Sequence, residues 1–139
     1  MKYLKVLVVP AFALVLFTAF KEEQKQKPSF DLKASIARGK EVYGSYCITC
    51  HMEQGEGIQD VYPPLAKSDY LMADKKRSIV VTLKGLSGEI KVNGTTYNAD
   101  MTSFDLSDQE VSDVLNYIRN SFGNKGEAVK PEEVKALRN

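Results

Sequence analysis

The chain has 139 residues, and its 19 Lys and Arg against 18 Asp and Glu give a formal net charge of only +1. Its only basic cluster is Lys75, Lys76 and Arg77, so a nucleic-acid partner has little electrostatic support. The chain has no tryptophan and two cysteines, enough for at most one disulfide. Because a small domain has limited apolar area to bury, another source of core would be useful.

Residues 1–20 (MKYLKVLVVPAFALVLFTAF) predict an export signal. Lys2 and Lys5 precede an uncharged apolar run over residues 6–20, which is typical of a secretory signal. A membrane-spanning helix needs about twenty apolar residues, more than this run offers. An uncleaved anchor, which would tether the protein to the membrane through residues 6–20, is the alternative. In both cases we expect the folded part in the periplasm or at the outer face of the cytoplasmic membrane.

Residues 21–30 (KEEQKQKPSF) are polar and carry no apolar period, as is typical of a flexible spacer. Leaving out Lys2 and Lys5 reduces the 19 basic residues to 17, against 18 acidic ones, so the remaining charge is near zero. We expect one domain over residues 31–123 and then a tail, residues 124–139, with a short helix.

The first predicted helix covers residues 31–47 (DLKASIARGKEVYGSYC). Asp31 or Ser29 can cap its start, because short oxygen-bearing side chains accept from the first free N–H groups. Gly39 lies inside this helix, where glycine costs about 1 kcal/mol relative to alanine. We therefore expect another helix to approach closely at Gly39. The apolar positions have helical spacing and are Ile36, Val42, Tyr43 and Tyr46.

Residues 52–70 are rich in glycine and proline and predict a long, wrapped loop. Residues 68–86 predict a short helix and then a second one, with an apolar side formed by Ile79, Val80 and Leu83. In residues 87–98, Ile90 alternates with Val92, and Asn93-Gly94 is a strong hairpin-turn signal. We expect a two-stranded ribbon there.

Residues 106–124 give the clearest helix signal. Ser107 and Glu110 can form a capping box, and Gly123 suits the C-terminal stop. Residues 130–139 predict an added helical turn or two, with Pro131 near the start. The chain is thus predicted to be mostly helical, with one late hairpin. The apolar stripe of the 106–124 segment is Val111, Val114, Leu115, Ile118 and Phe122.

The segment CITCH places Cys47, Cys50 and the only histidine, His51, within five residues. On a helix, residues three and four apart are neighbours, so these side chains would share one face. Two thiols at this spacing can bond to the two vinyl groups of a haem, and the imidazole can then bind the iron. C-x-x-C-H is the signature of c-type haem attachment.

Three other interpretations of Cys47 and Cys50 compete. A structural zinc site needs four ligands, and Asp or Glu would have to supply what a single histidine cannot. A dithiol redox motif belongs in a β-α-β setting, which this sequence does not show. A disulfide between these two cysteines would close too small a loop to constrain the unfolded chain much.

A haem iron held by His51 has a sixth position, open to methionine, lysine, water or nothing. Met1 lies in the signal, and Met52 adjoins His51 and cannot reach across the ring. Met72 follows Leu71 in a helical stretch and is predicted to fill a core gap. Met101 lies in an irregular segment, where the backbone is free to direct a sulfur at the metal. We therefore favour Met101.

With these residues the chain resembles the class I cytochromes c over about residues 31–123, and in particular bacterial variants with a small hairpin before the distal methionine. The resemblance implies an all-α fold of about four to five helices around one covalent haem c. In that family a glycine and an aromatic before the first cysteine pack on the last helix. Gly39 and Tyr43 match these positions, and Tyr117 matches the aromatic of the last helix.

The family also has a loop proline whose carbonyl accepts from the proximal histidine, and Pro63 matches it. Such a contact would fix the tautomer of His51 and tune its donor strength. One departure is Thr102, where the family commonly has proline after the methionine. This departure could loosen the segment that carries Met101.

A haem iron bound by His51 and Met101 has both axial positions filled, and a thioether favours Fe(II). We therefore expect an electron carrier rather than an enzyme, either free or as a subunit of a larger oxidoreductase, which docks transiently with a donor and an acceptor protein. If Met101 binds weakly, the alternative is a haem enzyme or gas sensor, such as a peroxidase or nitric oxide binder. A third class is a docking domain that the haem only stabilises. Lys75, Lys76 and Arg77 form either a steering patch or an ordinary solvated helix face.

Overall fold

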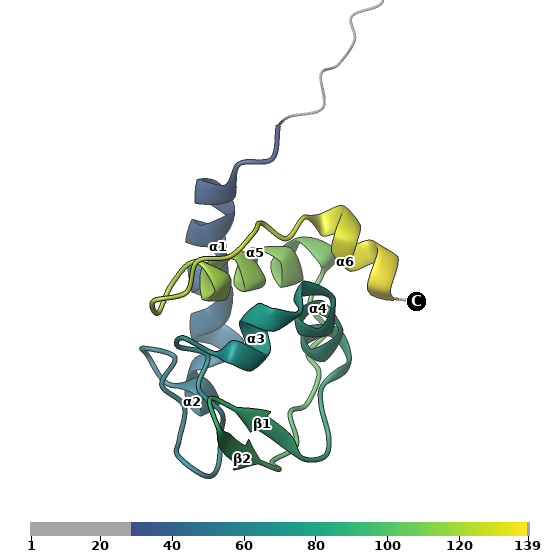
Figure 1. Ribbon diagram of the computed structural model, residues 1–139. Helices are drawn as coiled ribbons and strands as arrows, with labels where there is room; N and C mark the ends of the chain where they lie inside the picture. Colours follow the sequence, from purple (N-terminus) through teal and green to yellow (C-terminus); the bar gives the residue numbers. More distant parts are fainter. Residues whose placement is uncertain (1–28, 139) are drawn as a thin grey trace, which may run out of the picture.

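The computed structural model describes residues 29–138, which form a mostly helical fold with one small hairpin (Figure 1). The predicted signal segment and most of the predicted spacer lie outside the described residues. Within residues 29–138 there are six helices. The helix expected to reach Cys47 ends at Tyr46, and a separate single turn follows, which adds one helix to the predicted set.

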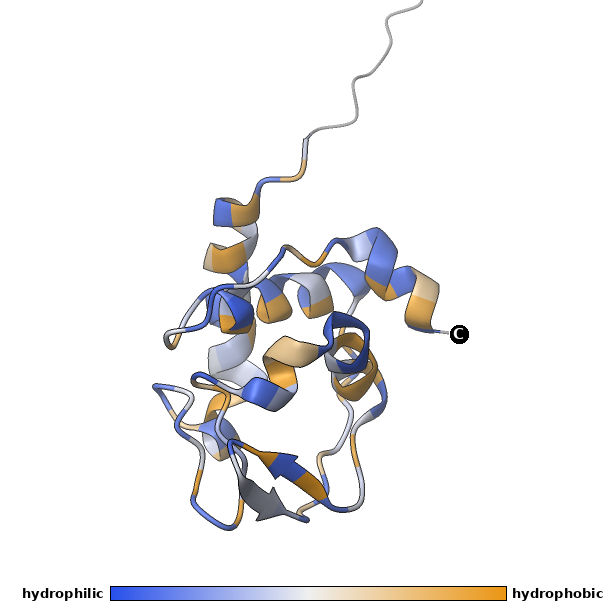
Figure 2. Cartoon of the chain, in the orientation of Figure 1, coloured by the Kyte–Doolittle hydropathy of each residue, from blue (hydrophilic) through white to orange (hydrophobic). Residues whose placement is uncertain are grey.

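Helix α1 (Leu32–Tyr46) begins at the predicted cap, because the Asp31 side chain accepts from the Ala34 N–H at 3.0 Å. It crosses α5 (Asp108–Arg119), and a Cβ added at Gly39 would lie 1.9 Å from the backbone oxygen of Asp113. The predicted close approach of a second helix at Gly39 is therefore confirmed. In Figure 2, hydrophobic and hydrophilic residues alternate along α1, as expected of a helix with one buried side.

Three aromatic rings pack together near the C-terminal end of α1, where it contacts α5 and the loop that follows. Tyr43 lies 5.4 Å from Tyr117 and 5.3 Å from Phe122 between ring centroids, within the range of favourable aromatic pairs. The contact between Tyr43 and Tyr117 confirms the predicted one. The prediction that Phe122 continues the helical stripe was wrong, since α5 ends at Arg119 and Phe122 has a φ of 56°. Phe122 instead follows a turn and reaches Tyr43 from the loop.

Helices α3 (Asp69–Ala73) and α4 (Lys75–Lys84) are capped by the side chains of Ser68 and Asp74. The predicted hairpin follows as β1 (Ile90–Val92) and β2 (Thr95–Tyr97), paired antiparallel with Ile90 opposite Tyr97. Its turn residues have φ values of 50° and 86°, which is the conformation that an Asn-Gly turn favours. Asn93 also exchanges two hydrogen bonds with Asp69, so the turn is fixed to α3.

Helix α6 (Pro131–Arg138) begins at the predicted proline and lies at the opposite end of the molecule from the hairpin (Figure 1). Its Val134 and the preceding Val129 are fully buried. They share a cluster with Ile79 of α4 and with Val111 and Leu115 of α5. The C-terminal segment is therefore packed into the core of the described structure.

Candidate haem-binding site

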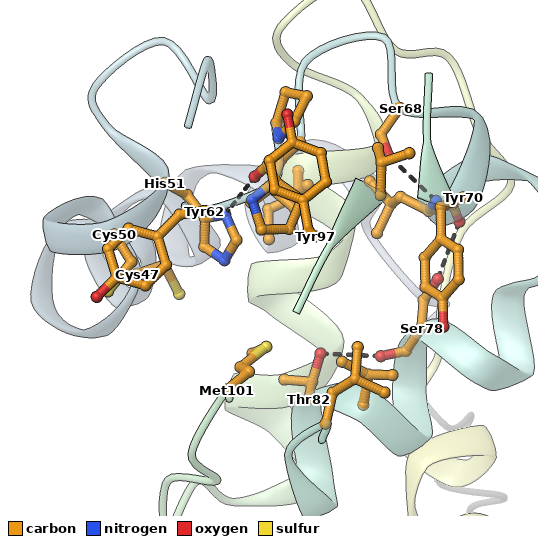
Figure 3. A pocket seen from close by; sticks show the side chains of 18 of the residues that line it. Cys47, Cys50, His51, Tyr62, Ser68, Tyr70, Ser78, Thr82, Tyr97 and Met101 are labelled. Atoms are coloured by element: carbon orange, nitrogen blue, oxygen red, sulfur yellow. Dashed lines mark hydrogen bonds between the residues drawn. The ribbon is translucent and has the colours of Figure 1, made fainter. Parts of the chain in front are cut away.

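A cavity of about 360 Å³ lies between α2 (Ile48–His51), the α3–α4 pair, the hairpin and α5. The structure brings all four predicted site residues to this cavity (Figure 3), namely Cys47, Cys50, His51 and Met101. The remaining lining is largely aliphatic and aromatic, and includes Leu65, Leu71, Val81, Val114 and Ile118. The cavity is therefore suited to a large apolar group rather than to a hydrated ion.

The two cysteines sit where the chain leaves one helix and begins the next. Cys47 caps both α1 and α2, and the His51 N–H donates to the Cys47 carbonyl at 3.0 Å, as in a helical turn. Cys47, Cys50 and His51 therefore line the same cavity, as their spacing predicted. Both cysteines are free and half-buried. Burial, with a smaller effect of Cys50, raises the pKa of the Cys47 thiol to about 11, so before attachment this thiol is protonated at neutral pH.

The imidazole of His51 is held by the backbone of Pro63, with 3.0 Å between Nδ1 and the carbonyl oxygen. A carbonyl only accepts, so Nδ1 carries the proton and Nε2 keeps its lone pair. Burial lowers the pKa of His51, although the Pro63 bond acts against this shift. The ring is therefore neutral at pH 7, the form that binds a metal. The predicted contact with Pro63 is confirmed.

Gly57 lets the Pro63 segment come close enough for this contact. It has a φ of +67°, and a Cβ there would lie 2.4 Å from the Tyr62 oxygen and 2.8 Å from the Pro63 oxygen. The Gly57 N–H also donates to the carbonyl of His51 at 3.1 Å. The sequence predicted only a loop here, although a glycine between His51 and Pro63 was a visible signal of tight folding.

Met101 lies in an irregular segment after the hairpin, as predicted, and lines the cavity. Figure 3 shows its side chain and the His51 ring reaching into the same space from opposite sides. Met72 is not among the lining residues but packs against the buried cluster that contains Leu71 and Ile118. The prediction that Met72 fills a core gap is confirmed.

The cavity fits the haem predicted from the sequence. Two thiols, an imidazole with a free Nε2 and a thioether converge on an apolar cavity, which is the donor set of a c-type haem site. The competing interpretations find less support in residues 29–138. No group of three or more His, Cys, Asp or Glu side chains there could hold a metal ion, and the two described strands are an antiparallel hairpin rather than part of a β-α-β unit.

The basic cluster on α4 is engaged within the protein. Lys75 pairs with Glu133 of α6 at 2.7 Å. The Arg77 guanidinium lies 3.8 Å above the centre of the Tyr70 ring and donates to the Tyr70 carbonyl. Two of the three cations thus have structural partners on α3 and α6, which weakens the interpretation of this cluster as a steering patch.

Comparisons with known proteins agree with this geometry. The family model for cytochrome c matches residues 36–122. Cytochrome c-552 of Thermus thermophilus is 41% identical over 117 residues, which cover 77% of this chain and 78% of that protein. The cytochrome c subunit of a quinone-dependent alcohol dehydrogenase from Gluconobacter oxydans is 34% identical over 105 residues, covering 72% of this chain and 22% of the subunit.

A third relative is the cytochrome c subunit of gluconate 2-dehydrogenase from Pantoea cypripedii, 30% identical over 104 residues, or 72% of this chain and 24% of that subunit. These relatives support an electron-carrier role. Among the helices of residues 29–138, none has the length and apolar character needed to cross a membrane.

Proposed function

The chain belongs to the cytochrome c family, and on that basis we propose that it is a mono-haem carrier that passes one electron between redox proteins outside the cytoplasm. It carries haem c, covalently bound through Cys47 and Cys50. The iron of this haem supplies a one-electron couple, and the chain's own residues hold and orient the group.

His51 and Met101 are proposed as the axial ligands. The observation that carries the proposal is the His51–Pro63 hydrogen bond of 3.0 Å, which leaves Nε2 as the free donor atom at a cavity that Met101 also lines. A histidine whose other nitrogen is tied to a carbonyl keeps one tautomer and one orientation. A soft, neutral thioether on the other side favours Fe(II) and raises the reduction potential.

The surrounding side chains are suited to electron transfer in which no substrate bond is made or broken. The cavity lining is largely apolar, so water is kept from the iron and the change in charge needs little rearrangement of solvent. If His51 and Met101 both bind the iron, a substrate would have to displace one of these side chains. We therefore propose that the protein is not an enzyme by itself, and that it serves either as a free carrier or beside a larger oxidoreductase.

We propose the cellular location and the redox partners from the sequence and the relatives. The predicted signal over residues 1–20 supports export to the periplasm or to the outer face of the cytoplasmic membrane. Two of the relatives are cytochrome subunits of dehydrogenases, which supports a dehydrogenase as a redox partner. Residues 6–20 would tether the carrier if the segment is not cleaved.

Absorption spectroscopy and mass measurement of the exported protein test the proposal. We expect a mass above that of the polypeptide by one haem, and the weak far-red band of an iron–thioether bond in the oxidised protein. Met101→Ala should lose that band and let the ferrous protein bind carbon monoxide. Met72→Ala, the matched control, should keep the band. A mass equal to the polypeptide alone would sink the proposal, and a band that survives in Met101→Ala would reassign the ligand.

A further inference from the structure

Two aromatic side chains at the cavity remain partly in water. Tyr46 is 43% exposed and Phe104 is 38% exposed, yet both also line the cavity. Their ring centroids lie 5.4 Å apart at an angle of 57°. Tyr46 directly precedes Cys47, and Phe104 follows Met101 by three residues. The ring pair therefore joins the two segments that carry the site, at the place where the cavity reaches the surface.

The pair lies outside the packed core of the described structure. Neither ring belongs to the two buried hydrophobic clusters, so their contact adds little to the core. Large exposed aromatics are uncommon on a surface that has no partner, and Tyr and Phe are enriched at the centres of protein interfaces. The position of the pair beside Cys47 and Met101 makes it the natural point of approach to the cofactor.

Acidic residues predominate in the two chain segments that contain the ring pair. Residues 41–66 and 92–118, which contain Cys47, His51 and Met101, include nine Asp and Glu but no Lys or Arg. The rest of residues 29–138 contains seven acidic and 14 basic residues. The near-zero net charge of the chain therefore combines two acidic segments, which contain the ring pair, with a basic remainder of residues 29–138.

Two of these carboxylates are close to the aromatic pair in the chain and are free to act on a partner. Asp100 lines the cavity beside Met101, and Asp105 follows Phe104 directly. Both are exposed and neither forms an ion pair with any residue of 29–138. By contrast, Asp113 and Asp108 in the same segment are paired with Arg38 and Arg138.

We propose that Tyr46 and Phe104, flanked by Asp100 and Asp105, form the docking face for a redox protein with an apolar centre and a rim of Lys and Arg. Complementary charge speeds the encounter, and the ring pair supplies the dry contact through which the electron passes. The proposal rests on the proposed function, since this face is useful only if an electron leaves or enters there.

Inorganic one-electron reagents test the face without knowledge of the partner. Tris(phenanthroline)cobalt(III) is cationic with apolar ligands and takes one electron from the ferrous protein to become cobalt(II). Ferricyanide accepts one electron in the same way but is anionic. We expect the rate with the cobalt complex to fall as salt rises and the rate with ferricyanide to increase. Poly-L-lysine should inhibit the cobalt reaction, and poly-L-glutamate should not.

Matched variants separate the docking face from the overall charge. Asp105→Lys and Glu127→Lys change the net charge equally, but Asp105 directly follows Phe104, whereas Glu127 lies between α5 and α6 and pairs with Lys75 of α4 at 3.8 Å. At about 0.1 M salt, where charges act over about 10 Å, Asp105→Lys should slow the cobalt reaction about fivefold or more. Glu127→Lys should change it by less than about twofold. Phe104→Ser should slow oxidation of the ferrous protein by the cobalt complex. It should leave unchanged the rate at which hexaammineruthenium(II), a cation without apolar ligands, gives one electron to the ferric protein and becomes ruthenium(III).

Different results would overturn the docking face and the proposed electron-carrier function. Haem absorption and far-ultraviolet circular dichroism identical to the parent protein establish that each variant is folded. Equal effects of Asp105→Lys and Glu127→Lys, or no effect of Phe104→Ser, would overturn the docking face while leaving the carrier intact. A protein that exchanges electrons with none of the three complexes would overturn the proposed function itself.

Discussion

Leu86 and Met101 exchange two backbone hydrogen bonds, N–H to O=C in both directions, at 2.9 and 2.8 Å. The bridge ties the segment that carries Met101 to the end of α4, although Thr102 replaces the proline that the cytochrome c resemblance led us to expect. This bridge holds the Met101 segment in place and so opposes the loosening predicted at Thr102. Gly85 makes the bridge possible, since a Cβ there would lie 2.3 Å from the Met101 oxygen.

Replacing Gly85 by alanine should displace the Met101 segment. The new methyl would collide with the Met101 carbonyl, and its φ of +78° adds strain that L residues avoid. We expect destabilisation by more than about 1 kcal/mol and a weakened far-red iron–thioether band. Gly88→Ala is the matched control, because its φ of +93° imposes similar strain but nothing lies within 4 Å. A band as weak in Gly88→Ala as in Gly85→Ala would mean that strain alone, not contact with Met101, is responsible.

Replacing Gly39 by alanine should push α1 and α5 apart. An added Cβ would lie 1.9 Å from the Asp113 oxygen and 2.9 Å from the Tyr117 Cβ, so one backbone has to move. Overpacking of this kind costs about 1–3 kcal/mol or more, measured as the free energy of unfolding in urea. Gly44→Ala lies on the same helix in open space and should stabilise by about 0.5–1 kcal/mol through helix propensity. The idea of a tight crossing fails if both changes stabilise.

The elements that the sequence predicted best are those with local signals. The start of α1 at Asp31, the capping box of α5 and the Asn93-Gly94 turn each depend on a few neighbouring residues, so their physics is visible in a short window. The same holds for Cys47, Cys50 and His51, whose spacing alone brings them to one cavity.

The features that the sequence did not predict depend on contacts far apart in the chain. The Leu86–Met101 bridge joins irregular segments that have no period. Asn116 is completely buried, although an asparagine on a helix suggests a solvated position, because its partner Val129 lies beyond a loop. Phe122 seemed to continue the stripe of α5 because periodicity does not reveal where the backbone turns.

Removing both cysteines should leave the protein poorly folded. Cys47→Ala/Cys50→Ala cannot hold the haem covalently, and a largely apolar cavity of about 360 Å³ would then face water or collapse. We expect a marked loss of helical signal in far-ultraviolet circular dichroism. Met101→Ala keeps both attachment points and should retain most of that signal. Full native helicity in the double variant would show that the helices form their core without the cofactor.

The capping box of α5 makes stability depend on pH. The Ser107 hydroxyl and N–H donate to Glu110 at 2.6 and 2.8 Å, and these bonds lower the pKa of Glu110 below its ordinary value. A carboxylate whose pKa is lowered by folding stabilises the fold when the pH is above its ordinary pKa. This contribution is lost as the pH falls through the pKa of the folded state. Glu110→Gln should therefore have a lower free energy of unfolding than the parent at pH 7. On acidification, its free energy of unfolding should fall by less than that of the parent. Glu41→Gln, an exposed change on α1, should track the parent in thermal unfolding across the same pH range, and similar behaviour of both variants would argue against the box.

Asn116 fastens the C-terminal segment to α5. Its side chain donates to the Val129 carbonyl and accepts from the Val129 N–H, both at 2.7 Å, in a fully buried position. Asn116→Ala leaves the Val129 N–H without a partner, and an unpaired buried group costs about 1–3 kcal/mol. Because Ser112 still donates to the Val129 carbonyl at 2.8 Å, the segment should loosen rather than detach. Hydrogen exchange of the Val129 and Val134 amides should accelerate together with the loss of stability.

Asn120→Ala, which removes a half-buried bond to the Asn116 carbonyl at 3.0 Å, should cost less than about 1 kcal/mol and leave that exchange slow. If exchange at Val129 is unchanged in Asn116→Ala, the segment is held by burial of Val129 and Val134 alone.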